Sequence, residues 1–207
     1  MSLVLIGAGG HALVVLDAAL AGSNPVTGLV DQALPVGQKI DGVPVLGNDE
    51  LLNDASFVQA HDFHLSMSGP AAKLRLAGLL EAKAASIASV VHPAATVSSS
   101  ARIEPGAFIN AGAVVNAQTL IGPHVIVNTR ASIDHGCRIG AAVHVAPGVT
   151  MCGDVVVGEA AEIGPGAVVG RGVRIGAEAV IGAGAVVLSD VSAGNRVWGV
   201  PARPSAG

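Results

Sequence analysis

One segment of the chain gathers polar side chains where most neighbouring stretches are small and apolar. Asn128, Asp134 and His135 belong to this segment, and His144 follows His135 by nine residues. An imidazole changes its protonation state near neutral pH and is the side chain that most often moves a proton during catalysis. The segment therefore holds candidates for proton transfer, with a solvated surface histidine as the alternative at each of the two positions.

A strict six-residue spacing runs through the same part of the chain. From Val91 to Val187 every sixth residue is Ile or Val, with Met151 as the one exception. A short fixed period indicates a solenoid, in which each unit buries its apolar face against its neighbours. One unit fits a short strand and a turn, and three consecutive units make one triangular coil. Glycine follows the aliphatic residue at several places where we expect a tight bend, namely Gly122, Gly140, Gly158, Gly164, Gly170, Gly176 and Gly182.

The three-unit coil predicts which residues meet on successive coils. Gly153 lies one full coil after His135, so we expect the two to stack side by side. A glycine leaves its backbone N–H open to approach, which makes Gly153 a candidate donor to the oxyanion of a tetrahedral intermediate.

Residues 1–87 show a different pattern. Apolar strands alternate with helical stretches, which predicts a small parallel sheet of Rossmann type. Strands are expected at 2–6, 26–30, 42–47 and 63–67, and helices at 12–21, 48–53 and 70–85.

The turn after the first strand reads Gly7-Ala8-Gly9-Gly10-His11, and the second strand ends in Asp31. Backbone N–H groups at a helix N-terminus favour a phosphate, and a carboxylate at the second strand often binds a ribose hydroxyl. We expect Gly9, Gly10, His11 and Asp31 to bind a nucleotide, with a purely structural turn as the alternative. A domain of this length fits a mononucleotide better than NAD.

Together these features resemble the hexapeptide-repeat acyltransferases. The Gly-Gly-His turn, the Asp134-His135 segment and the tail 199–203 are similar to those of the nucleotide-aminosugar N-acetyltransferases of bacterial glycan synthesis and the sialic acid O-acetyltransferases. The resemblance implies a Rossmann-like nucleotide-sugar-binding domain at 1–87, a left-handed parallel β-helix at 88–190 and a C-terminal tail at 191–207. The left hand comes from the resemblance alone, because parallel crossovers generally favour the right hand.

The resemblance also implies roles for individual residues. His135 would be the general base that takes the proton of a sugar amine as the amine attacks acetyl-CoA, and the backbone of Gly153 would bind the oxyanion. His144 and Arg203 would contact acetyl-CoA, together with Gly153. Asn128 would approach the sugar, although Asn110 lies one full coil earlier and allows a structural asparagine ladder instead. The resemblance implies a homotrimer with each active site between two neighbours.

The chain departs from the family pattern directly after His135. The family commonly has an acidic residue at that position, whereas this chain has Gly136. Asp134 should face the other side of the strand. Asp154 lies one full coil after Gly136, so either Asp154 or a backbone carbonyl is expected to take over the role of the missing acid.

Composition narrows the classes of function. The net charge of −4 argues against a nucleic-acid partner, and the chain has no apolar run long enough to span a membrane. Met1 to Leu5 has no basic region of the kind that opens a signal peptide. Cys137 and Cys152 show neither metal-type spacing nor an implied disulfide. Composition therefore favours a reduced, cytoplasmic protein, while the resemblance implies an enzyme that uses acetyl-CoA and no metal.

Other functions remain as alternatives. Sialic acid or sugar O-acetylation and a non-catalytic nucleotide-sugar scaffold fit much of the same pattern. A γ-class carbonic anhydrase fits poorly, because His124, His135 and His144 fall at three different positions around the coil. A purely structural or ice-binding solenoid fits poorly as well, because ice-binding faces need threonine ladders and this chain has few threonines.

Overall fold

The structure is a computed structural model that describes residues 2–22 and 25–204. The chain divides into two compact units, Met1–Pro93 and Ala94–Gly207. The division lies beyond the expected boundary at residue 87, because β7 (Val90–Val91) still packs against α1 (Gly10–Ala21) in the first unit.

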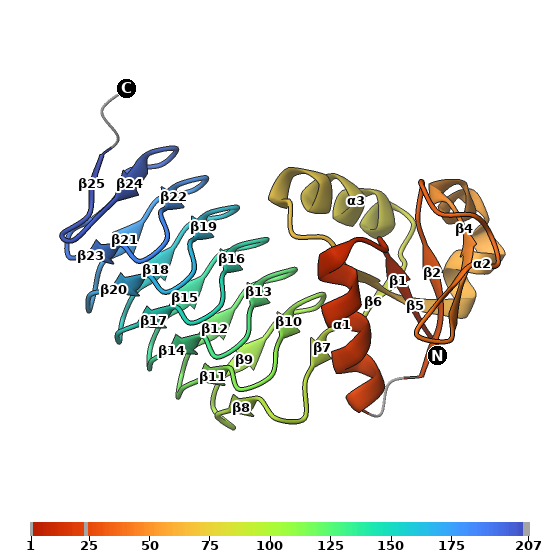
Figure 1. The fold of residues 1–207 in the computed structure, drawn as a ribbon, viewed down its shortest axis with the longest axis horizontal. Helices are drawn as coiled ribbons and strands as arrows, with labels where there is room; N and C mark the ends of the chain where they lie inside the picture. Colours follow the sequence, from red (N-terminus) through yellow and green to blue (C-terminus); the bar gives the residue numbers. More distant parts are fainter. Residues whose placement is uncertain (1, 23–24, 205–207) are drawn as a thin grey trace. The chain divides into compact units, whose positions relative to one another are not determined.

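The first unit contains a six-stranded sheet with the order β3-β4-β2-β1-β5-β6 (Figure 1). All neighbours are parallel except β3 and β4. Its elements are β1 (Ser2–Ile6), α1, β2 (Val26–Val30), β3 (Lys39–Ile40), β4 (Val43–Gly47), the 3-10 helix η1 (Asp49–Asn53), α2 (Ala55–Ala60), β5 (His61–Leu65), α3 (Pro70–Ala82) and β6 (Ser86–Ile87). This is the Rossmann-like arrangement expected from the alternating pattern; β3 and α2 were not anticipated.

The strand order reverses beside β1. The chain steps from β1 to β2 and β4 on one side, and then returns to β5 on the other side. In open parallel sheets, ligands bind at the carboxyl ends of the strands at this kind of reversal. The Gly-rich turn directly follows β1, so the fold places it at the expected ligand-binding edge.

The second unit is a parallel β-helix built from three ladders of short strands, shown in green to blue in Figure 1. The ladders run β10-β13-β16-β19-β22-β24, β8-β11-β14-β17-β20-β23 and β9-β12-β15-β18-β21. The strands are β8 (Thr96–Val97), β9 (Arg102–Ile103), β10 (Phe108–Ile109), β11 (Val114–Val115), β12 (Leu120–Ile121), β13 (Ile126–Val127), β14 (Ser132–Ile133), β15 (Arg138–Ile139), β16 (His144–Val145), β17 (Thr150–Met151), β18 (Val156–Val157), β19 (Glu162–Ile163), β20 (Val168–Val169), β21 (Arg174–Ile175), β22 (Val180–Ile181), β23 (Val186–Val187), β24 (Arg196–Trp198) and β25 (Arg203–Pro204).

The register of the coils is the predicted one. Ile133 pairs with Met151 and Ile139 with Val157, in each case three six-residue units further along the chain. From Ile109 to Val187, the residues of the six-residue series form one buried core with small alanines and Cys137, and the partly buried Val97 and Ile103 pack against it. Because each coil adds the same set of inward side chains, the sequence period determines the register.

The glycines that follow the aliphatic residues are explained by crowding between coils and not by a tight bend. A Cβ at Gly140 would lie 2.8 Å from the backbone nitrogen of Glu159, and one at Gly122 would lie 2.7 Å from the carbonyl oxygen of Ile139. The left-handed turn positions are occupied by other residues, among them Gly136 with φ 69°. Close stacking of successive backbones therefore selects glycine after the aliphatic residue.

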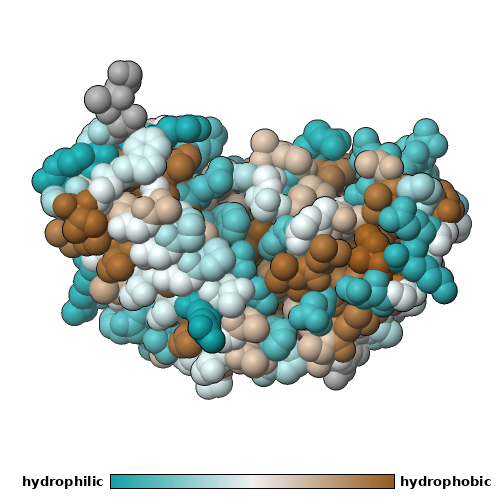
Figure 2. Space-filling model, viewed as in Figure 1, coloured by the Kyte–Doolittle hydropathy of each residue, from teal (hydrophilic) through white to brown (hydrophobic). Residues whose placement is uncertain are grey.

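Residues 191–204 continue the β-helix instead of leaving it as a separate tail. Arg196 pairs with Val180 in parallel, and Val197 is buried in the same core. β25 then returns antiparallel along β24. Figure 2 shows an apolar area at this end of the β-helix, where Leu188, Trp198 and Val200 are exposed. Across the described residues, no helix combines the length and apolarity that a membrane crossing requires.

Candidate active site

The corner between β14 and β15 presents His135. Asp134 fixes this corner, because its Oδ1 accepts the His135 N–H at 2.8 Å and the Asn116 Nδ2–H at 3.2 Å. The Thr119 hydroxyl donates to the Asp134 carbonyl at 2.8 Å. The backbone of the turn is therefore held from the preceding coil, while the His135 side chain remains about half exposed, at 51%.

The His135 ring lies against Gly153 on the next coil, as the coil register predicts. A Cβ built on Gly153 would lie 2.6 Å from both Nε2 and Cε1 of His135. Within residues 2–22 and 25–204, no protein acceptor binds the Gly153 N–H. The structure thus brings together an imidazole and a backbone donor, which are the two groups that acyl transfer to a nucleophile requires.

Asp154 approaches the other side of the same ring. Its Oδ1 lies 3.8 Å from His135 Nδ1, and its backbone N–H donates to the His135 carbonyl at 2.9 Å. Arg171 donates to the second carboxylate oxygen, Oδ2, from Nη2 at 2.9 Å and from Nε at 3.1 Å. Arg171 was not among the residues expected from the sequence.

His144 lies elsewhere on the coil. It is in β16, between Ile126 and Glu162 on the neighbouring coils, and this ladder contains neither of the strands that flank His135. The step of nine residues from His135 to His144 amounts to half of one coil. Within one chain, the structure therefore does not bring His144 to the His135 site.

Asn128 forms an asparagine ladder with Asn110, which was one of the two roles that the sequence allowed for it. Asn110 Nδ2 donates to Asn128 Oδ1 at 3.1 Å and to the Thr129 hydroxyl at 2.9 Å. Asn128 Oδ1 also accepts the Thr129 N–H at 2.8 Å. The side-chain carbonyl oxygen of Asn128 is thus engaged in supporting the backbone of the coil.

A second candidate site lies at the Gly-rich turn of the first unit. A pocket of about 350 Å³ opens at the carboxyl ends of β1 and β2. Its lining includes Gly7, Asp31, Gln32, Asp49 and Arg75. Side chains at Gly9 and Gly10 would meet nothing within 4 Å, so the backbone there is open to a ligand.

Asp31 shapes the Gly-rich turn through its carboxylate. Oδ2 accepts the Ala8 N–H at 2.8 Å, and Oδ1 accepts the N–H groups of Ala33 at 2.9 Å and Leu34 at 3.2 Å. Asp31 therefore supports the turn itself as well as lining the pocket. His11 lies in the first turn of α1, directly after Gly10.

Arg75 is the cation of this pocket, and sequence reasoning did not single it out. It lies on α3, the helix that follows β5 across the strand reversal. A helix in that position faces the ligand-binding edge of a parallel sheet, and this rule could have identified Arg75 from the sequence. Arg75 could hold a phosphate.

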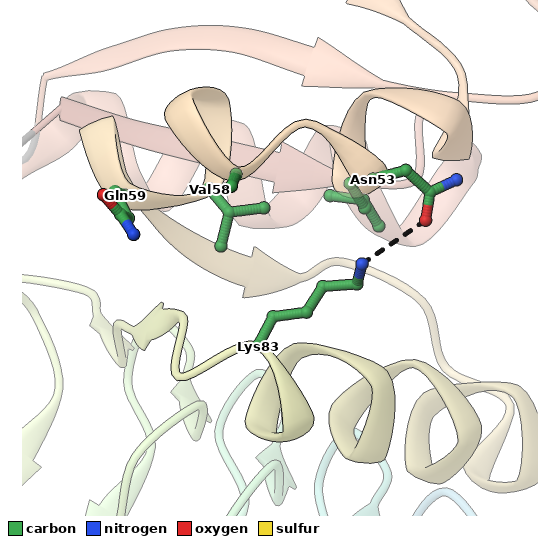
Figure 3. Close-up of a pocket in the computed structure, with 6 residues that line it drawn as sticks. Asn53, Val58, Gln59 and Lys83 are labelled. Atoms are coloured by element: carbon green, nitrogen blue, oxygen red, sulfur yellow. Dashed lines mark hydrogen bonds between the residues drawn. The ribbon is translucent and has the colours of Figure 1, made fainter.

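Two further cavities lie away from these residues. One of about 200 Å³ lies at the end of the β-helix, and Arg203 lines it with Leu188 and Asp190. The other, of about 170 Å³, is shown in Figure 3, where Lys83 reaches across to donate to Asn53 Oδ1 at 3.4 Å. This third cavity contains none of the expected site residues.

The two cysteines of the β-helix carry free thiols. Cys137 and Cys152 are both free, and burial raises the pKa of the Cys137 thiol. The Cys137 thiol donates to the Cys152 carbonyl oxygen at 3.3 Å. Among the described residues, no three His, Cys, Asp or Glu side chains are grouped so that they could hold a metal ion.

Comparisons with known proteins agree with this architecture. The PglD N-terminal domain family matches residues 2–78, and the bacterial transferase hexapeptide family matches residues 154–189. A search of curated proteins found no match.

Several solved structures match nearly the whole chain. Perosamine N-acetyltransferase from Caulobacter crescentus, solved in complex with CoA and GDP-perosamine, is 36% identical with a TM-score of 0.93, over 100% of this chain and 98% of that one. The acetyltransferase domain of PglB from Neisseria gonorrhoeae, in complex with acetyl coenzyme A, is 34% identical with a TM-score of 0.91, over 99% and 98%. WeeI from Acinetobacter baumannii is 25% identical with a TM-score of 0.85, over 99% and 100%.

These matches confirm the Rossmann-like domain and the left-handed parallel β-helix. The chain therefore belongs to the hexapeptide-repeat acyltransferases of the nucleotide-aminosugar N-acetyltransferase and sialic acid O-acetyltransferase family.

Proposed function

We propose that this protein transfers the acetyl group of acetyl-CoA to the amine of a nucleotide-linked aminosugar, with His135 as the general base. The stacking of His135 on Gly153 is the observation that carries the proposal. The imidazole lies beside a backbone N–H that has no acceptor among the described residues, in a chain that matches perosamine N-acetyltransferase over its full length, and this supports the proposal.

The chemistry requires no acyl-enzyme. The sugar amine attacks the thioester carbonyl as His135 accepts a proton from the amine nitrogen. The backbone N–H of Gly153 stabilises the oxyanion of the tetrahedral intermediate. When this intermediate collapses, the carbon–sulfur bond breaks and the imidazolium returns a proton to the CoA thiolate, which leaves an amide and free CoA.

The first unit would hold the nucleotide. Gly9 and Gly10 have open space where side chains would be, and Arg75 adds a positive charge to the pocket that Gly7 and Asp31 line. The GDP-perosamine complex of the Caulobacter relative supports a guanosine diphosphate as the first nucleotide to test. The substrate class supports a role in bacterial glycan synthesis, and acetyl-CoA use together with two free thiols supports a cytoplasmic enzyme.

The proposal includes a homotrimer. His135 and His144 lie half a coil apart, so one chain does not supply both to a single site. A three-fold arrangement would let His135 of one protomer and His144 of its neighbour meet the same acetyl-CoA. Arg203, exposed at the end of the β-helix, would bind the phosphate end of that CoA.

The test is CoA release from acetyl-CoA across GDP-, UDP- and dTDP-linked aminosugars, with the acetylated product identified by mass. We expect turnover with at least one nucleotide aminosugar. His135→Ala should lower kcat by about 10²–10⁴-fold while the nucleotide sugar still binds. Turnover near the wild-type rate in His135→Ala, or acetylation of free sugar hydroxyls alone, would contradict the proposal.

A further inference from the structure

The carboxylate beside His135 comes from the next coil of the β-helix. Residue 136, directly after the histidine, is a glycine with φ 69°. A Cβ built on Gly136 would lie 2.5 Å from Oδ1 of Asp154. The Asp154 carboxylate therefore occupies the space that a side chain at position 136 would fill.

The two carboxylate oxygens of Asp154 have different neighbours. Arg171 binds Oδ2 through both Nη2 and Nε, which leaves Oδ1 directed to His135 Nδ1 at 3.8 Å. The Asp154 N–H also donates to the His135 carbonyl at 2.9 Å, so the two backbones are tied together. The side chains of His135, Asp154 and Arg171 lie on three successive coils, because Gly153 follows His135 by one full coil and Arg171 follows Gly153 by another.

The nearby Asp134 carboxylate is engaged elsewhere. Its Oδ1 accepts from the His135 N–H and from Asn116 Nδ2, so it supports the turn and not the ring. Asp154 is thus the carboxylate that faces the imidazole, and Arg171 is the cation that faces Asp154.

We propose that Asp154 is the positioning carboxylate of His135, that Arg171 holds it in place, and that Gly136 is required because Asp154 occupies its side-chain space. An acceptor at Nδ1 keeps the proton on that nitrogen and leaves Nε2 free to accept a proton from the substrate. During turnover, the exposed ring closes the remaining distance to Oδ1, as catalytic hydrogen bonds often tighten when substrate is bound.

The inference rests on the proposed role of His135 as the base, and its experiment separates the two. Steady-state rates and pH–rate profiles are compared for the wild type, Asp154→Asn and Arg171→Gln. Asp154→Asn should lower kcat/KM by about 10–100-fold, the range for second-shell partners that orient an imidazole. It should also move the acid limb of the profile to lower pH, because the imidazolium loses its neighbouring negative charge.

Arg171→Gln should move the acid limb in the opposite direction. Removing the guanidinium leaves the negative charge of Asp154 uncompensated beside the ring, which favours the protonated imidazole and shifts the limb to higher pH. A purely structural role for Asp154 and Arg171 would lower the rate in both variants without opposite shifts. Glu178→Gln and Arg174→Gln are matched controls, because Glu178 also occupies a left-handed turn position, with φ 57°, and Arg174 is an exposed arginine of the same β-helix.

A double exchange moves the carboxylate to the position after the histidine. Asp154→Gly should be slow, and adding Gly136→Asp should restore kcat/KM to within about tenfold of wild type. Aspartate tolerates the left-handed conformation at residue 136, and glycine at 154 leaves room for it. Thermal unfolding verifies that each variant is folded.

The outcomes distinguish the inference from the proposed function. If Asp154→Asn kept the wild-type rate and pH–rate profile, the positioning role of Asp154 would be overturned. The same would follow if the double variant folded but were as slow as Asp154→Gly. In both cases a slow His135→Ala variant would leave the proposed function intact. Turnover near the wild-type rate in His135→Ala would overturn the proposed function itself. If the double variant does not fold, the opposite pH shifts of Asp154→Asn and Arg171→Gln still decide the matter.

Discussion

At the scale of single residues, the missing side chain of Gly153 leaves room for the His135 ring. A Cβ at that position would lie 2.6 Å from Nε2 and Cε1. Gly153→Ala keeps the backbone N–H and changes only the position of the ring. We expect kcat/KM to fall by about 10²-fold, as a displacement of roughly 1 Å at a reacting group does, with little change in the melting temperature.

The control for Gly153→Ala is Gly170→Ala in the same β-helix, where a new Cβ would approach the Val187 carbonyl oxygen at 3.3 Å and touch no candidate catalytic group. A Gly153→Ala enzyme as active as Gly170→Ala would show that the ring position in the structure is not the working one.

The two thiols should differ in reactivity. Burial raises the pKa of the Cys137 thiol, so the thiol form dominates at neutral pH, and the side chain is shielded from reagents. Cys152 is only partly buried. Alkylation of the native protein followed by mass analysis should modify Cys152 first and Cys137 only on unfolding, and activity should survive in Cys152→Ala if neither thiol is a nucleophile. Prior labelling of Cys137 in the folded enzyme would contradict this order.

The site was only partly predictable from residue types. His135 and Gly153 could be paired from the sequence, because the coil register fixes which residues stack. Arg171 was missed, because its link to Asp154 depends on the direction of a long exposed side chain and not on register. Asn128 was left undecided, since an asparagine at that position can face either a ligand or its neighbour Asn110; the observed hydrogen bonds favour the ladder.

At the scale of elements, α3 contains a buried lysine. Lys73 is 1% exposed, and burial lowers its pKa to about 7 from 10.5. Between these two values the unfolded chain holds one proton more than the folded chain, so the free energy of unfolding should rise with pH across that window. Below about pH 7 both states are protonated and this contribution no longer changes.

Urea unfolding at several pH values between 7 and 10 measures this slope. The slope from a single lysine is at most about 1.4 kcal/mol per pH unit. Lys73→Met should remove it, whereas Lys83→Met, a change at the lysine that follows the same helix, should not. Equal pH dependence in both variants would show that Lys73 is not the source.

The long repetitive β-helix was more predictable from the sequence than short, single elements. The coils between Val91 and Val187 could be read from one aliphatic residue per six, because each coil repeats the same inward positions. The two-residue β3 and the six-residue α2 were missed, since such short elements carry too few residues to show a period. The end of the β-helix was placed too early, because Val191 and Val197 are out of step with the six-residue series although both are buried in its core.

At the scale of the whole molecule, the chain joins a nucleotide-binding candidate to an acyl-transfer candidate. The first unit offers open backbone and Arg75 at a sheet edge, and the second offers His135 and Gly153 at a corner of the coil. His144 is separated from that corner by half a coil, so a complete site requires another copy of the chain if His144 contacts the same acetyl-CoA.

Mixed trimers test this arrangement directly. His135→Ala and His144→Ala chains, each weakly active alone, are co-expressed with different tags, and particles that carry both tags are purified. In a cyclic trimer, each site would take His135 from one protomer and His144 from the next. Such a site is intact where a His144→Ala chain supplies His135 and the next protomer, a His135→Ala chain, supplies His144. Each particle with both tags then has one intact site among its three, and restored turnover should approach about a third of the wild-type rate. If both histidines acted within one protomer, no mixed site would be intact, and mixing would leave activity at the level of the separate variants.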